Sequence, residues 1–163
     1  MIYRSALLCL YALAAAGSAE ARSQACSAQG KPDPVGVARA MEACWAERDV
    51  DGLMIHIADD AEYLNAIGSV WHGRTEIRAG WEALAKTSRA GDPVMDEYRL
   101  SMLSPTVALV TAYGHLDLPD GGTGNPARLP TFGTFVMVKA DGRWLLKSGH
   151  TSAPPILTPS ARQ

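Results

Sequence analysis

The chain has 163 residues, of which 47% are hydrophobic and 20% are charged, and its formal net charge is −2 at pH 7. This length is enough for one domain with a single core, but not for two domains of ordinary size. Lysines and arginines are scattered singly along the sequence. Nucleic acid is therefore excluded as an expected partner, because its binding depends on concentrated neutralisation of phosphates.

The first segment, residues 1–21, has the pattern of a secretory signal peptide. Arg4 and the amino terminus supply positive charge, an apolar run follows over 6–16, and Ala19 and Ala21 provide the small residues of a cleavage site. A membrane anchor is the alternative, but spanning the hydrocarbon of a bilayer takes roughly 20 apolar residues. The sequence predicts cleavage near Ala21, a periplasmic or secreted protein, and no membrane association after cleavage.

Two cysteines remain once Cys9 has left with the signal peptide, namely Cys26 and Cys44. In an oxidising compartment such a pair can form one disulfide. Here the bond would tie the N-terminal tail to the first helix. Two free thiols, with Cys44 buried, are the alternative.

Helical patterns follow a polar tail at 22–34 that we expect to be flexible. Apolar residues spaced i, i+3, i+4 and i+7 predict a first helix over about 35–48. A short second helix is expected over 52–58, and a Gly-Arg-Thr start opens a third helix that extends from 73 to about 88.

Strand patterns fill most of the remaining sequence. The Asp-Gly pair at 141–142 is typical of a tight hairpin, and the proline-rich tail at 153–163 is expected outside the sheet. Helices followed by a run of antiparallel strands predict the α+β class. The expected strands cover 61–67, 95–103, 106–118, 130–140 and 143–152.

Two stretches resemble a known superfamily when taken in order. They are "AERDVDGLMIHIADDAEYLNAIGSVWHGRTEI" at 46–77 and "DGRWLLKSGHTS" at 141–152. Together they resemble the nuclear transport factor 2-like superfamily, in particular its SnoaL-like, SgcJ/EcaC-type branch, over about 35–152. The resemblance implies a cone-shaped fold, with three N-terminal helices packed on a strongly bent, mostly antiparallel sheet around an internal pocket. It also implies a homodimer through the outer face of the sheet, where Val110 and Ala112 are expected.

Alternation along the strand at 61–67 places Tyr63 and Asn65 on one face. The resemblance to ketosteroid isomerase, an enzyme of this superfamily, places Asn65 where that enzyme carries its aspartate base. It places Met41 where the isomerase needs a tyrosine. An amide donates and accepts hydrogen bonds but cannot abstract a proton at neutral pH. Isomerase chemistry of that type is therefore not expected.

His150 is the other candidate for acid–base chemistry. It alternates with Trp144 and Leu146 on the last strand, so we expect it to point into the same cavity as Asn65. A histidine there could act as general acid or base. The alternative is a histidine that bonds a backbone carbonyl and stabilises the end of the strand.

Aromatic side chains are expected to line the pocket, with plain core packing as their alternative. The four histidines are dispersed and no glycine-rich phosphate loop precedes a helix, so neither a metal nor a cofactor is expected. We expect a site for a small apolar or aromatic molecule. The protein would be a cofactor-free isomerase, dehydratase or hydrolase using His150, or else a non-catalytic periplasmic binding or assembly module. The expected substrate-binding residues are Tyr63, Asn65, Trp71, Trp81, Tyr98 and Tyr113.

We expect export to remove the first 21 residues, so that the mature protein begins at or near Arg22. The measurement is N-terminal sequencing of the protein recovered from the periplasm or the medium. A cytosolic pool that retains Met1 as its only form would contradict the signal-peptide prediction.

Overall fold

The computed structural model describes residue 26 and residues 33–87, 93–117 and 128–152. The predicted signal peptide, most of the tail at 22–34 and the tail at 153–163 lie outside these residues. None of the helices in the described part is both long enough and apolar enough to cross a bilayer. In chain order the elements are α2 (Pro34–Ala46), α3 (Val50–Met54), β1 (Ile57–Leu64), β2 (Val70–His72), α4 (Gly73–Lys86), β3 (Pro93–Ser104), β4 (Val107–Asp117), β5 (Arg128–Ala140) and β6 (Arg143–Ser152).

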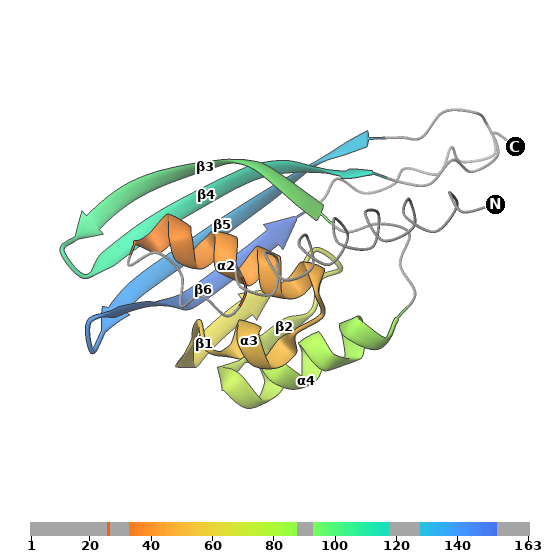
Figure 1. The fold of residues 1–163 in the computed structure, drawn as a ribbon, viewed down its shortest axis with the longest axis horizontal. Coiled ribbons are helices and arrows are strands. Elements are labelled where there is room, and N and C mark those ends of the chain that lie inside the picture. Colours follow the sequence, from red (N-terminus) through yellow and green to blue (C-terminus); the bar gives the residue numbers. More distant parts are fainter. Residues whose placement is uncertain (1–25, 27–32, 88–92, 118–127, 153–163) are drawn as a thin grey trace, which may run out of the picture.

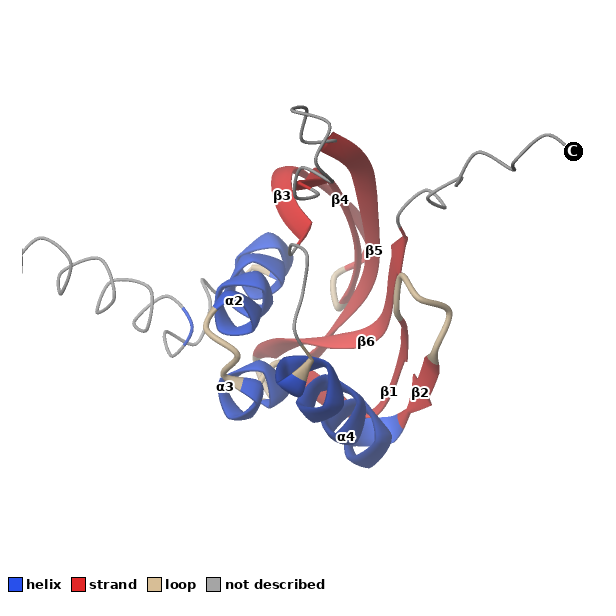
Figure 2. Cartoon of the chain, turned by 90° about the vertical axis from the view of Figure 1, so that its right-hand side faces the viewer, coloured by secondary structure: helices blue, strands red, loops and turns tan. Residues whose placement is uncertain are grey.

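The six described strands form one mixed sheet in the order β2-β1-β6-β5-β4-β3 (Figure 1). β1 pairs with β6 in parallel, and the other neighbouring pairs are antiparallel. Figure 2 shows the sheet curving around α2, α3 and α4, which lie on its concave side. The predicted α+β class is confirmed, and the core lies between these helices and the concave face.

Two helices, α2 and α3, begin where an aspartate side chain satisfies one of their first backbone donors. Asp33 caps α2 by accepting the Gly36 N–H at 2.8 Å, and Pro34 occupies the first turn, where a missing N–H costs nothing. Asp49 caps α3 in the same way through the Gly52 N–H at 2.8 Å. Because Asp49 is the cap, the second helix begins at Val50 and not at residue 52. It ends at Met54 and not at residue 58, and β1 begins at Ile57, earlier than predicted. The sequence does not predict β2, because three residues are too few to show a period.

An irregularity in β6 reverses the direction of its side chains. Leu146 pairs with Met137, but Ser148 pairs with the adjacent Val136, so Lys147 is an extra residue. On the other side of β6, residues 58–61 of β1 stand opposite this same position. A one-residue bulge turns every following side chain to the other face. The side chain of Lys147 contacts the residues of β1 that stand opposite the bulge. Its Nζ lies 2.5 Å from Oδ2 of Asp60 and 3.1 Å from the carbonyl oxygen of Asp60.

The convex face of the sheet carries residues different from those that the sequence predicts. Val110 and Ala112 are fully buried on the concave face, because Ala112 pairs with Tyr98 and directly paired residues share a face. The convex face instead carries Tyr113 and Phe132, whose rings meet edge to face with centroids 6.0 Å apart. Phe132 is 44% exposed, and none of the three described helices covers this face.

A disulfide bond joins Cys26 to Cys44 inside the core. A Cβ added at Gly52 would stand 2.7 Å from the Cys26 sulfur, so the bond also lies against α3. The backbone of Cys26 is hydrogen-bonded to His56, directly before β1. One covalent link therefore holds the N-terminal segment against α2, α3 and the start of the sheet.

We expect the double substitution Cys26→Ala/Cys44→Ala to lower the free energy of unfolding by about 3 kcal/mol. The reason is that a cross-link across a loop of this length removes chain entropy from the unfolded state. Urea denaturation of the oxidised mature protein and of the variant measures the difference. Equal midpoints, or two reactive thiols in the folded wild-type protein, would contradict this expectation.

The homodimer expected from the sequence stays a prediction, and the convex face gives it a sharper test. Phe132→Glu places a charge on that face and should shift a dimer toward monomer in light scattering at micromolar concentration, because burying an unpaired charge is costly. Ile55→Glu is the matched control, since Ile55 is 41% exposed on the helical side. A wild-type protein with the mass of a monomer would refute the dimer.

Candidate functional site

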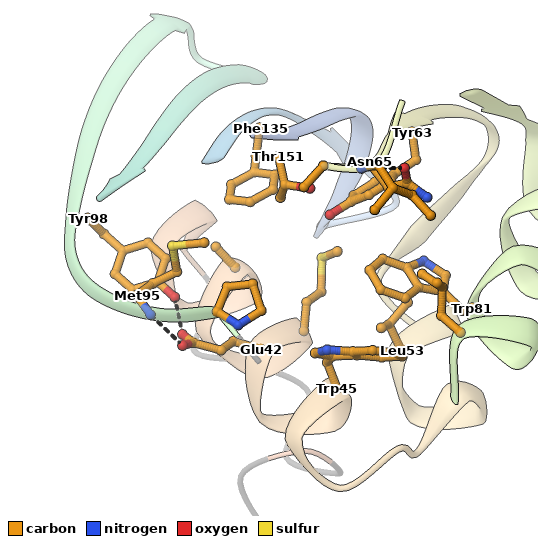
Figure 3. A pocket seen from close by; sticks show the side chains of 16 residues that line it. Glu42, Trp45, Leu53, Tyr63, Asn65, Trp81, Met95, Tyr98, Phe135 and Thr151 are labelled. Atoms are coloured by element: carbon orange, nitrogen blue, oxygen red, sulfur yellow. Dashed lines mark hydrogen bonds between the residues drawn. The ribbon is translucent and has the colours of Figure 1, made fainter. Parts of the chain in front are cut away.

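A cavity of about 240 Å³ lies between the helices and the concave face of the sheet. Most of its wall is apolar or aromatic, and Figure 3 shows the side chains that line it. Ile67, which is 76% exposed, is part of the wall, so the cavity reaches the surface beside the turn after β1. The lining residues are Ala38, Met41, Glu42, Trp45, Leu53, Tyr63, Asn65, Ala66, Ile67, Trp81, Leu84, Pro93, Met95, Tyr98, Phe135 and Thr151.

Asn65 lines this cavity and carries a hydrogen-bond donor that is unpaired among the described residues. Its Oδ1 accepts the N–H groups of Ile67 at 3.1 Å and Ser69 at 2.9 Å, which closes the turn after β1. Because both partners are donors, the oxygen of the amide must face the turn, and Nδ2 must face the other way. Asn65 is 7% exposed, and its Nδ2 has no acceptor among the described residues.

Trp81 presents a second unpaired donor. The ring of Trp81 packs against Trp45, Tyr63 and Trp71, with centroids 4.7, 5.1 and 5.8 Å away. This packing holds the indole firmly, yet its buried Nε1 has no acceptor in the described part of the chain. Figure 3 shows Asn65 and Trp81 on the same side of the cavity, away from Glu42 and Tyr98.

Tyr63 and Thr151 form a neutral polar pair in the wall. Burial raises the pKa of the Tyr63 hydroxyl to about 12, and the hydrogen bond between Tyr63 and Thr151 opposes that shift only in part. The phenol therefore stays protonated at neutral pH and acts as a hydrogen-bonding group.

Glu42 is the only charged residue among the described residues that line this cavity. Oε1 of Glu42 accepts the backbone N–H of Met95 at 2.8 Å, and Oε2 accepts the hydroxyl of Tyr98. Burial and this carboxylate together raise the pKa of Tyr98, with the exposed Arg39 acting in the opposite direction. The pair joins α2 to the first half of β3 across the sheet edge.

Three of the residues predicted for the site lie elsewhere. His150 is exposed and does not line the cavity, so the expectation that it shares a cavity with Asn65 is wrong. The extra residue Lys147 is the reason, since it turns Gly149 and Thr151 inward and His150 outward. Tyr113 lies on the convex face, opposite to Tyr98. Trp71 stands behind the wall, stacked on Tyr63 with centroids 6.1 Å apart.

The other predicted residues, Tyr63, Asn65, Trp81 and Tyr98, all line the cavity, but the sequence analysis misses Glu42 and Thr151. Glu42 could have been found, because residues 38, 41, 42 and 45 follow the i, i+3, i+4, i+7 spacing of one helical face. An acidic residue in such an apolar stripe is a signal in itself. Thr151 could not have been found without knowledge of the bulge.

The cysteines and His56 do not form a second site. Cys26, Cys44 and Asp49 lie close enough to share a metal ion, but the two sulfurs are bonded to each other. His56 is buried, and burial first and Arg143 second lower its pKa. It is therefore a neutral core residue at physiological pH.

Solved structures place this architecture in a known class. They include an NTF2-like protein of unknown function from Pseudomonas putida, with 19% identity and a TM-score of 0.63 over 77% of this chain and 88% of that one. A protein with a cystatin-like fold from Caulobacter vibrioides has 21% identity and a TM-score of 0.63 over 74% and 86%. A ketosteroid isomerase-like protein from Erwinia carotovora atroseptica has 16% identity and a TM-score of 0.59 over 73% and 92%.

At these identities the likeness concerns the fold, which is that of the nuclear transport factor 2-like superfamily. The model of the SnoaL-like domain family matches residues 37–156. Since this match covers most of the chain, the protein belongs to the SnoaL-like family. No curated protein matches the chain significantly. The SgcJ/EcaC-type branch stays a prediction.

Proposed function

We propose that the protein binds a small, largely apolar organic molecule that carries a hydrogen-bond acceptor such as a carbonyl oxygen. The observation that carries this proposal is a pair of buried donors, Asn65 Nδ2 and Trp81 Nε1. They lie on one side of an aromatic cavity and have no acceptors among the described residues. Leaving a buried donor unpaired costs about 1–3 kcal/mol. An acceptor on the ligand removes this cost, so the pair both attracts and orients it.

The size of the cavity limits the ligand. A cavity of about 150 Å³ holds benzene, so a volume of about 240 Å³ suits a molecule of roughly ten non-hydrogen atoms. The wall of aromatic rings with a few polar groups has the composition of small-molecule sites in general. This supports a monocyclic aromatic or a short aliphatic compound as the ligand class.

Binding is favoured over catalysis by the positions of the polar groups. The fold is compatible with isomerase-type activity, as the ketosteroid isomerase-like relative indicates. His150 lies outside the cavity, however, and Asn65 offers a donor, not a base. A non-catalytic ligand-binding module is thus the better supported function. We propose the periplasm or the medium as its location, on the pattern of residues 1–21.

Asn65→Asp tests the proposal with little change in shape. An aspartate can still accept the N–H groups of Ile67 and Ser69, but it turns an oxygen to the cavity where the donor was. We expect the wild-type protein to bind acetophenone about tenfold more tightly than ethylbenzene, which corresponds to about 1.4 kcal/mol. This preference should disappear in Asn65→Asp and shrink in Trp81→Phe. NMR titration of the mature protein measures the affinities.

Thr131→Val is the matched control. Thr131 also has a buried hydroxyl without a partner among the described residues, but it does not line the cavity. The ratio of the affinities for acetophenone and ethylbenzene should be the same in Thr131→Val as in the wild-type protein. A wild-type protein that binds neither probe, or a preference for the ketone that survives in Asn65→Asp, would rule out the proposed role of the donor pair.

A further inference from the structure

The end of the cavity at Glu42 differs in kind from the end at Asn65. Among the sixteen residues that line the cavity, Glu42 is the only one with a carboxyl group, and none has a basic side chain. Its two oxygens each accept one hydrogen bond, from Met95 and from Tyr98. A carboxylate can accept about four, so Glu42, which lines the cavity, retains capacity for a further donor.

Among the described residues, no cation is paired with this carboxylate. Within the described part of the chain, none of the ion pairs includes Glu42. Arg39 is exposed, and its guanidinium lies over the ring of Tyr98, 4.5 Å from the centroid, without lining the cavity. A carboxylate that is partly removed from water gains most from a cation that approaches through the cavity.

The walls next to Glu42 suit a cation as well. Aromatic faces attract ammonium and guanidinium groups, and more strongly where water is excluded. Two of the lining rings already contact such groups, since Arg48 lies over Trp45 at 4.5 Å as Arg39 lies over Tyr98. Tyr63, Trp81 and Phe135 extend the aromatic wall toward the end at Asn65.

We infer that the ligand is a small organic amine, whose ammonium group binds at Glu42 and whose body packs against the aromatic rings. This inference rests on the proposed function and deepens it. The unpaired donors at Asn65 and Trp81 would take an oxygen at the other end of the same molecule. The charges argue against a carboxylate ligand, because it would meet the like charge of Glu42, and none of the described lining residues has a basic group to offset that charge.

The test compares probes of nearly equal size that differ in charge. These are 2-phenylethylamine, 2-phenylethanol and phenylacetate, titrated at pH 7.5 into the mature protein by calorimetry or NMR. We expect the amine to bind about tenfold more tightly than the alcohol, and phenylacetate to bind more weakly than either. In Glu42→Gln, which keeps an acceptor for Tyr98 or Met95, the ratio of amine to alcohol should fall to about one.

Two further variants separate recognition from folding. Glu47→Gln removes the same charge from the exposed C-terminal end of α2, outside the cavity, and should leave the ratio unchanged. Tyr98→Phe keeps the carboxylate and frees Oε2, so the preference for the amine should persist. If Glu42→Gln fails to fold, loss of the preference in Tyr98→Phe would count against the inference.

The outcomes distinguish this inference from the proposed function. Equal binding of amine and alcohol by the wild-type protein would overturn the amine class, while binding of the ketone probe would still support the neutral site at Asn65. A preference for the amine that is unchanged in Glu42→Gln would also overturn it. In that case the hydrogen bonds of Glu42 to β3 would be purely structural.

Discussion

Lys147, the extra residue in β6, determines which side chains reach the interior of this protein. Before it, Trp144 and Leu146 are buried against the helices, and after it Gly149 and Thr151 take over the concave face. The residues of β1 opposite the bulge are irregular as well, and Asp60 binds the Lys147 side chain from there. An exposed ion pair contributes little stability. What matters is the register, because a shift of one residue exchanges the two faces of the strand.

The cavity depends on that register at one end and on a helix-to-strand contact at the other. At the first end Tyr63 packs where Gly149 leaves room, since a Cβ there would lie 2.6 Å from the ring. At the second end Glu42 ties α2 to β3 through the Met95 backbone and the Tyr98 hydroxyl. Without close packing, the helices and the bent sheet would leave apolar surface uncovered. The contacts of Glu42 with β3 hold α2 close to the sheet.

The polar groups of the cavity are arranged differently from those of a proton-transfer site. Oδ1 of Asn65 accepts hydrogen bonds from the backbone of a turn, which leaves its Nδ2 as an unpaired donor. Trp81 can only donate. Glu42 faces them from the other side as an acceptor. In the function that we propose, this arrangement binds the two ends of one ligand by hydrogen bonding and by charge. Members of one fold class carry unrelated functions, so this reading of the site outweighs the likeness of the fold.

The sequence by itself determined the features that depend on near neighbours. The helical face of α2, the third helix from Gly73, the Asp141-Gly142 hairpin and the α+β class follow from periodicity and turn chemistry, and the structure has them. The inward direction of Asn65 also follows from alternation along a short strand. Glu42 was within reach, because it stands in an apolar stripe whose period the sequence displays.

Only the tertiary structure decided which alternate face of the long strands points inward. Alternation says which residues share a face, but not which face is buried, and β4 has apolar residues on both. Only the pairing of β3 with β4 therefore shows that Tyr98 and Tyr113 lie on opposite faces of the sheet. Thr151, and not His150, faces the interior because of one extra residue in β6. The strands that pair at this residue, β1 and β5, include segments far away in the sequence. A bulge is a property of pairing between strands, so no pattern within a single strand could have predicted it.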